Sequence, residues 1–171
     1  MVHDAMGINA TTLRALIEAE LRGVADPRVH EYINGALIEP HVVFGQWDYG
    51  EPGQKYPCWV VFDDVRSKAA ISYCEYGFGP RCPWGLFGSG DHDQSMGMDS
   101  GWFTTFMDAF FGSVAATKLP IWRVFTVGPN GVRTPLGGEG SWDATWEQIE
   151  LLRSRDPDGR YDCDHSISYL R

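Results

Sequence analysis

PCWVVFDD (residues 57–64) and AAISYCEY (residues 69–76) are the two segments that decide the fold of this chain. Both are rich in β-branched and aromatic residues, which is typical of buried strands. The connection between them is so short that it favours an antiparallel pair. IEPHVVFGQW at residues 38–47 has the same composition, so the sequence predicts an antiparallel meander over 38–76.

The turn that follows Asp64 also predicts a register for this pair. The expected cross-strand pairs on one face are Val60–Tyr73 and Phe62–Ile71. A slip of one residue would exchange the two faces of each strand, because side chains alternate along a strand.

Helices are predicted before the meander, in a helical segment at residues 10–37. Apolar residues recur at helical spacing over 10–22, where Thr11 or Thr12 can cap the start. Asp26 followed by Pro27 predicts the start of a second helix, because proline suits the first helical position.

The region after the meander begins with a segment at 77–99 that is rich in glycine and proline. We expect this segment to be a long ordered loop packed onto the core. The phenylalanines that follow recur at helical spacing, and Asp99 or Ser100 is expected to cap that helix.

The remaining residues, from about 120 to the end, predict strands and one more helix. IWRVFTV at 121–127 is an expected strand, and Pro135 places its hairpin partner at a sheet edge. Ser141 is expected to cap a helix, DPDGRYDCDH to form turns, and SISYL at 166–170 to form a terminal strand.

These expectations define the fold class as α+β. An antiparallel sheet of about four to six strands carries all of these helices, the late one included, mainly on one face. The whole chain, 1–171, is expected to be a single globular domain, with a helix–strand–helix remainder at 100–171.

The composition of the chain indicates which class of partner it binds and in which cellular compartment it lies. The net charge of −9 argues against nucleic acid as a partner and favours a basic protein. The chain shows no signal peptide and no apolar run long enough for a membrane span, so the four cysteines are expected to stay reduced in the cytoplasm.

The motif GSGDHDQSMGMDSGW at 88–102 concentrates the residues that most resemble a metal site. Asp91-x-Asp93-x-Ser95 opens like a calcium loop, but Met96 stands where such a loop needs glycine. A transition metal could recruit His92 with Asp91 or Asp93, helped by His41 or His165, although no HxH, HExxH or CxxC spacing occurs. We therefore expect no metal and no cofactor, and the metal site stays an alternative.

The same loop offers candidates for acid–base and nucleophilic catalysis. Ser89 lacks the GxSxG context of a nucleophile elbow. Cys82 could pair with His92 as thiol and imidazole, with Asp91 and Asp93 as the acidic partners. This set defines the alternative function, a hydrolase that uses a metal or acts without one.

The function that the sequence favours is a non-catalytic acidic binding protein of the bacterial cytoplasm. Small acidic immunity proteins of bacterial toxins share this composition, so the partner would be a basic protein that the chain inhibits. The oligomeric state is left open. The expected aromatic and acidic contact residues are Trp47, Asp48, Tyr49, Trp84, Asp91 and Asp93.

Overall fold

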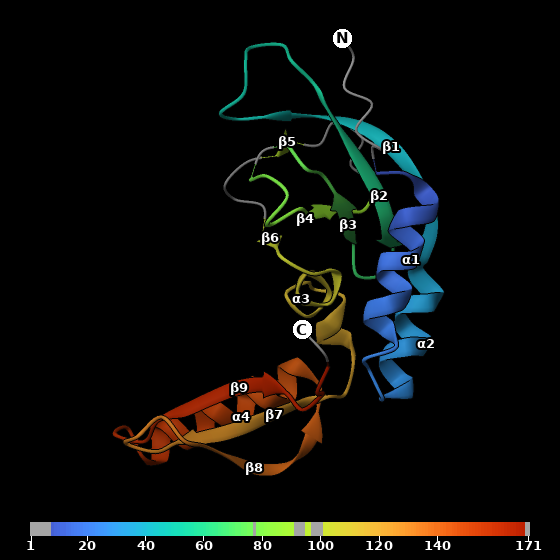
Figure 1. Cartoon of the computed structure of the whole chain (residues 1–171). Helices are drawn as coiled ribbons and strands as arrows, with labels where there is room; N and C mark the ends of the chain where they lie inside the picture. Colours follow the sequence, from blue (N-terminus) through green and yellow to red (C-terminus); the bar gives the residue numbers. More distant parts are fainter. Residues whose placement is uncertain (1–7, 77, 91–94, 97–100, 170–171) are drawn as a thin grey trace.

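The computed structural model of the chain describes residues 8–76, 78–90, 95–96 and 101–169. The described residues form helices and two separate sheets, so the predicted α+β class is confirmed. In Figure 1 the larger sheet and the smaller sheet lie on opposite sides of helix α3 (Phe106–Phe111).

The larger sheet has six strands in the order β5-β1-β2-β3-β4-β6. Its strands are β1 (Leu37–Trp47), β2 (Tyr56–Asp64), β3 (Ala69–Tyr73), β4 (Trp84–Gly88), β5 (Ser95–Met96) and β6 (Trp102–Phe103). Neighbouring strands are antiparallel, except that β5 runs parallel to β1. The predicted meander is therefore confirmed as the centre of this sheet.

The predicted register between β2 and β3 is right at one pair and wrong at the other. Phe62 lies opposite Ile71, as expected. Val60 lies opposite Ser72 rather than Tyr73, because an irregularity between Val60 and Phe62 shifts the register by one residue. No feature of the sequence marks this irregularity.

The segment 77–99 is not one continuous loop, as the sequence had suggested. WGLFG pairs with AAISY as strand β4, and Ser95–Met96 pair with the end of β1. A Cβ atom at Gly85 would lie 3.0 Å from the ring of Trp102, so glycine here lets β6 pack closely against β4. Gly85, one of the glycines on which the loop prediction rested, is thus required for the close packing of β4 and β6.

Helices α1 (Ala10–Leu21), α2 (Pro27–Ala36) and α3 cover one face of the larger sheet. The core between these helices and the sheet contains Leu13, Ile33, Phe62, Phe106 and Phe110, all fully buried. In this core Phe62 contacts the rings of both Phe106 and Phe110 edge to face.

The helix starts only partly follow the prediction. Asp26 caps α2 as expected, whereas Asn9, and not Thr11 or Thr12, caps α1. Helix α3 is short and is capped by Thr105, so the expected start at Asp99 or Ser100 is wrong. Strand β6 occupies the first part of the expected helix, because Trp102 and Phe103 pair with β4.

The smaller sheet has the order β8-β7-β9. It contains β7 (Trp122–Val127), β8 (Arg133–Gly140) and β9 (Tyr161–His165). Pro135 lies in the edge strand β8, as predicted. The terminal strand is β9, within the segment that was expected to form turns, and Ser166–Tyr169 of the expected strand are not in a strand.

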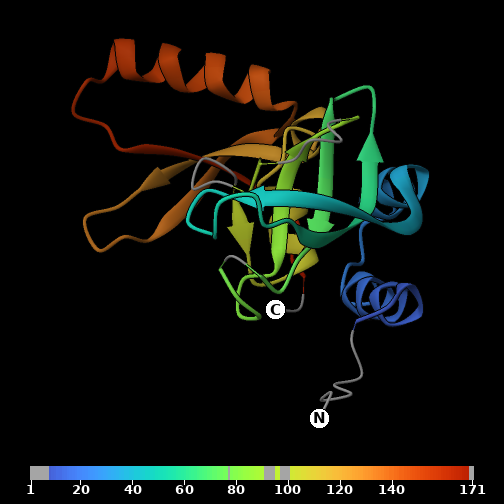
Figure 2. The ribbon, with the colours of Figure 1, turned by 90° about the horizontal axis from the view of Figure 1, so that it is seen from above.

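Helix α4 (Trp142–Arg155), capped by Ser141 as predicted, packs against this smaller sheet. Figure 2 shows α4 well apart from α1 and α2. The expectation that the late helix joins the layer over the larger sheet is therefore wrong, because α4 has a sheet of its own.

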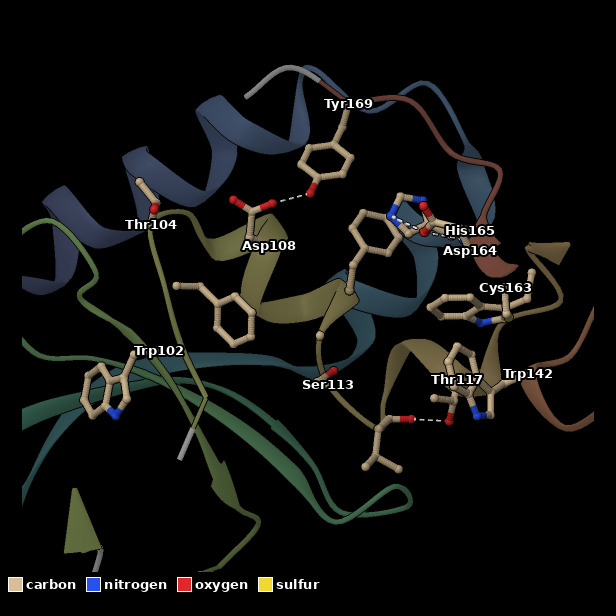
Figure 3. Close-up of a pocket in the computed structure, with 15 residues that line it drawn as sticks. Trp102, Thr104, Asp108, Ser113, Thr117, Trp142, Cys163, Asp164, His165 and Tyr169 are labelled. Atoms are coloured by element: carbon tan, nitrogen blue, oxygen red, sulfur yellow. Dashed lines mark hydrogen bonds and ion pairs between the residues drawn. The ribbon is translucent and has the colours of Figure 1, made fainter. Parts of the chain in front are cut away.

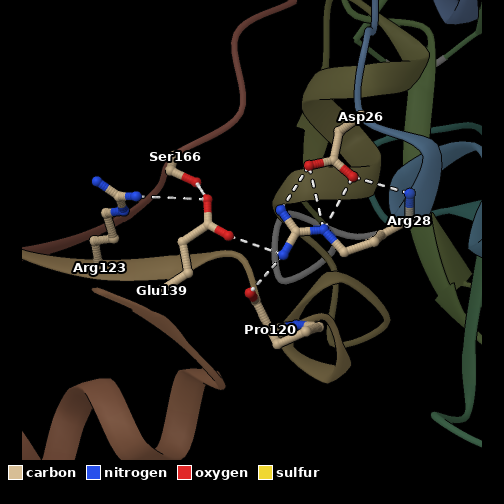
Figure 4. A network of polar contacts seen from close by, with 6 residues as sticks. All are labelled: Asp26, Arg28, Pro120, Arg123, Glu139 and Ser166. Carbon is tan, nitrogen blue, oxygen red and sulfur yellow. Dashed lines mark hydrogen bonds and ion pairs between the residues drawn. The ribbon is translucent and has the colours of Figure 1, made fainter.

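A network of polar contacts links the N-terminal helices to the smaller sheet (Figure 4). The guanidinium of Arg28 donates to Asp26 at 2.6 Å, to Glu139 of β8 at 2.8 Å and to the carbonyl of Pro120 at 3.1 Å. Glu139 also accepts from Ser166 and lies 3.9 Å from Arg123. We call the contacts of Arg28, Asp26, Glu139 and Pro120 the Arg28 clasp.

Candidate functional site

The predicted catalytic and metal sets centre on Asp91, His92 and Asp93, which lie outside the described residues. Of their expected companions, His41 is exposed on β1 and Cys82 is half-buried between β3 and β4. Within the described part of the chain, no group of three His, Cys, Asp or Glu side chains could hold a metal ion. The metal and hydrolase alternatives therefore gain no support from the described residues.

Three predicted contact residues, Trp47, Asp48 and Tyr49, lie together where β1 ends and turns toward β2. The ring centroid of Trp47 lies 5.9 Å from that of Tyr49 and 6.5 Å from that of Tyr56. Tyr56 in turn lies 5.3 Å from Tyr76, which follows β3. Four aromatic rings thus form one continuous row across neighbouring strands.

This row is anchored at its centre and exposed at its ends. Trp47 and Tyr56 pack on the buried thiols of Cys58 and Cys74. Tyr49 and Tyr76 are 63% and 50% exposed. The row and the exposed carboxylates of the same region form what we call the hairpin surface, made of Trp47, Asp48, Tyr49, Glu51, Tyr56, Glu75 and Tyr76.

Trp84, the fourth predicted contact residue, belongs to the core instead. It is only 3% exposed, and its ring contacts Tyr73 and Phe106 edge to face. Trp84 pairs with Tyr73 across β4 and β3, on the sheet face that the helices cover. It cannot contact a partner there, so its assignment to the contact surface is wrong.

A second candidate site lies between α3 and the smaller sheet (Figure 3). It is an open cavity of about 690 Å³, which is large enough for a ligand of drug size. We call it the aromatic hollow. Its walls include Trp102, Phe103, Phe111, Trp122, Trp142 and Tyr169, together with Asp108, Asp164 and His165.

Contacts among these rings fix the walls of the aromatic hollow. The rings of Phe111 and His165 stack with centroids 3.9 Å apart, and Tyr169 lies against Phe111 at 5.0 Å. Trp142 meets Trp122 edge to face at 4.6 Å. The walls are therefore formed by residues from β6, α3, the start of α4, the smaller sheet and the chain after β9.

Two carboxylates line the aromatic hollow, in different electrostatic settings. Asp164 forms an ion pair with Arg133 at 2.9 Å. Asp108 accepts a hydrogen bond from the hydroxyl of Tyr169 at 2.5 Å, and within the described chain it makes no ion pair. The charge of Asp108 is thus balanced by hydrogen bonding alone among the residues described.

A third carboxylate, Glu20 of α1, adds negative charge near Asp108. Glu20 accepts from the backbone N–H groups of Phe106 and Met107 at 3.2 and 2.9 Å, at the start of α3. Burial raises the pKa of Glu20 above its usual range, and the neighbouring charge of Asp108 acts in the same direction.

The hydroxyl and thiol groups of the hollow are poorly placed for nucleophilic attack. Ser113 and Thr117 donate their hydroxyl protons to the backbone carbonyls of Phe110 and Val114. Burial, together with the neighbouring aspartates, raises the pKa of Cys163 to about 11, which keeps it a thiol at neutral pH. Among the described lining residues, the geometry favours binding over covalent catalysis.

The residues of the aromatic hollow come from segments far apart in the chain, so no local pattern in the sequence predicts this site. One signal was available, since YDCDH at 161–165 alternates as a strand does. The prediction of turns is wrong for this segment, which forms β9. The alternation would have placed Cys163 and His165 on one face.

Comparisons with known proteins add no relative from which a function could be carried over. No protein-family model matches the chain, and neither a curated protein nor a solved structure is significantly similar to it. Among the described helices, none has the length and apolar character needed to cross a membrane.

Proposed function

We propose that this chain is a non-catalytic binding protein for a basic protein partner, and that the hairpin surface is its contact site. The observation that carries this proposal is the row of four aromatic rings, with exposed Tyr49 and Tyr76 at its ends. Tyrosine and tryptophan supply large, rigid contact areas and dominate the binding energy of many interfaces.

The charge of the hairpin surface and of the whole chain supports a basic partner. The exposed carboxylates of Asp48, Glu51 and Glu75 flank the rings, against the single cation of Lys55 in the turn. The net charge of −9 would accelerate the encounter with a basic protein. Inhibition of a basic toxin, as immunity proteins perform it, is the form of this function that we favour.

The proposal assigns the protein to the bacterial cytoplasm, where thiols stay reduced. No disulfide joins the four cysteines, all of which lie in the described part of the chain. Cys58 and Cys74 are fully buried beneath Trp47 and Tyr56, where they support the aromatic row as small apolar side chains.

The test measures binding to purified basic proteins of pI above about 9, beginning with the product of the neighbouring gene. Binding is followed by biolayer interferometry at physiological salt. The double variant Tyr49→Ala/Tyr76→Ala should weaken binding at least about tenfold, because exposed aromatic anchors contribute most of such an interface.

The matched control is Val65→Ala, which alters a side chain 74% exposed in the turn after β2. This variant should bind as the original chain does. If no basic protein binds, or if the double variant binds as tightly as the control, the proposed function is wrong.

A further inference from the structure

The aromatic hollow has a chemical character that the proposed function does not use. Its described lining residues include the carboxylates of Asp108 and Asp164 but no lysine or arginine. Asp164 is already paired with Arg133, so Asp108 is the lining carboxylate that lacks a cationic partner among the described residues. A ligand that complements this wall carries positive charge.

The negative charge of Glu20 near Asp108 further favours the binding of a cation at this carboxylate. Burial is the main cause of the raised pKa of Glu20, and the nearby charge of Asp108 adds to it, so the two carboxylates repel each other. A cation beside Asp108 would relieve this repulsion as well as pair with the carboxylate. The hydrogen bond from Tyr169 occupies Oδ1 of Asp108, and no other side chain among the described residues donates to Oδ2.

The aromatic walls favour an organic cation over a metal ion. The faces of Trp, Tyr and Phe rings attract ammonium and guanidinium groups. A guanidinium in particular stacks on a ring and donates to a carboxylate at the same time. Figure 3 shows Asp108 and Tyr169 together on one side of the hollow and Trp142 on the other side.

We propose that the aromatic hollow binds an organic cation of the guanidinium or ammonium class, with Asp108 as the counter-ion and the aromatic walls as its lining. At about 690 Å³ the hollow has room for a basic side chain together with the chain that carries it. The cation is therefore either the side chain of a protein or a free small molecule. This site is separate from the hairpin surface.

The experiment titrates the full chain with N-acetyl-arginine amide, and with a short Gly/Ser peptide that contains one arginine. Tryptophan fluorescence reports binding, because Trp102, Trp122 and Trp142 line the hollow, and calorimetry gives the affinity. N-acetyl-glutamate amide is the anionic control and should not bind. Added salt should weaken the binding of both cationic probes.

Variants separate the carboxylate from a structural role. Asp108→Asn should weaken binding of the arginine probes at least about tenfold, because a charge-assisted contact is lost. Asp143→Asn removes an equal charge from the exposed first turn of α4 and should leave binding unchanged. Tyr169→Phe keeps the carboxylate, removes only its hydrogen bond, and should retain binding.

The proposal is overturned if neither arginine probe binds, if Asp108→Asn binds as well as the original chain, or if Tyr169→Phe loses as much affinity as Asp108→Asn. A peptide that binds at least about tenfold more tightly than the free amide identifies the cation as a protein side chain. Similar affinities identify it as a small molecule. Binding of the probes without capture of any basic protein would leave this site standing while the proposed function fails.

Discussion

The Arg28 clasp predicts a measurable contribution to stability, which replacement of Arg28 by Ala or Lys will test. Arg28 is the residue through which the start of α2 contacts the segment before β7 and the end of β8. Ala removes the whole guanidinium. Lys keeps the positive charge, but its ammonium group lacks the planar fork with which the guanidinium donates to Asp26, Glu139 and Pro120 at once.

The structure sets the size of the expected effect. Two of the contacts are long-range, at 2.8 Å to Glu139 and 3.1 Å to the carbonyl of Pro120. A buried hydrogen bond to a charged group contributes about 1.5–3 kcal/mol, whereas an exposed ion pair contributes about 0.2–1 kcal/mol. The side chain of Arg28 is 38% exposed, so we expect Arg28→Ala to lower the free energy of unfolding by about 1–2 kcal/mol.

Urea denaturation, followed by circular dichroism, measures this free energy. Arg28→Lys should lose about half as much as Arg28→Ala, and a double-mutant cycle with Glu139→Gln should give a coupling of about 0.5–1 kcal/mol. The control is Arg22→Ala, which removes an exposed arginine that forms no ion pair within the described chain. A loss no greater than that of Arg22→Ala, or a cycle without coupling, would refute this reasoning.

Two further predictions concern the pH dependence of stability and the reactivity of thiols. Burial would raise the pKa of Asp64, but hydrogen bonds, including one from Tyr32 at 2.5 Å, outweigh it and hold that pKa below its usual value. Because the pKa of Asp64 is lower in the folded chain than in the unfolded chain, its carboxylate stabilises the fold above about pH 4, and this stabilisation is lost on acidification. The free energy of unfolding, measured between pH 3 and 7, should therefore depend less on pH in Asp64→Asn than in the original chain. An equal dependence on pH in both chains would contradict the lowered pKa. Cys58 and Cys74 should react with a disulfide reagent at pH 8 only after unfolding in urea, and Cys163, with its pKa raised to about 11, should react slowly in the folded chain. Rapid reaction of all thiols without urea would show that the described packing is wrong.

The central meander and most helix positions could be predicted because local patterns determine them. Alternation and turn length identify β2 and β3, and Asp26-Pro27 marks the start of α2. The short strands β5 and β6 have no such pattern, since their pairing depends on neighbours distant in sequence. The start of α3 was predicted too early for the same reason, because β6 precedes this helix and pairs with β4.

The candidate site was predictable only where its residues are neighbours along the chain. Trp47, Asp48 and Tyr49 lie in one turn, so the composition of that turn was enough to select them. Trp84 was misassigned because an amphipathic residue can serve a core or a surface, and only the strand register decides between them. The aromatic hollow required the tertiary fold.

The edge strand β8 has a consequence for how this protein behaves at high concentration. An open strand edge can recruit the same edge of another molecule and begin aggregation. In β8, Pro135 lacks a backbone donor, and Gly137 adopts a positive φ of 75°. At the opposite edge, β9 carries the carboxylates of Asp162 and Asp164, which pair with Arg133 and would lose water if another strand were added there. Both borders of the smaller sheet therefore resist intermolecular strand addition, which protects the chain from polymerising when it is abundant.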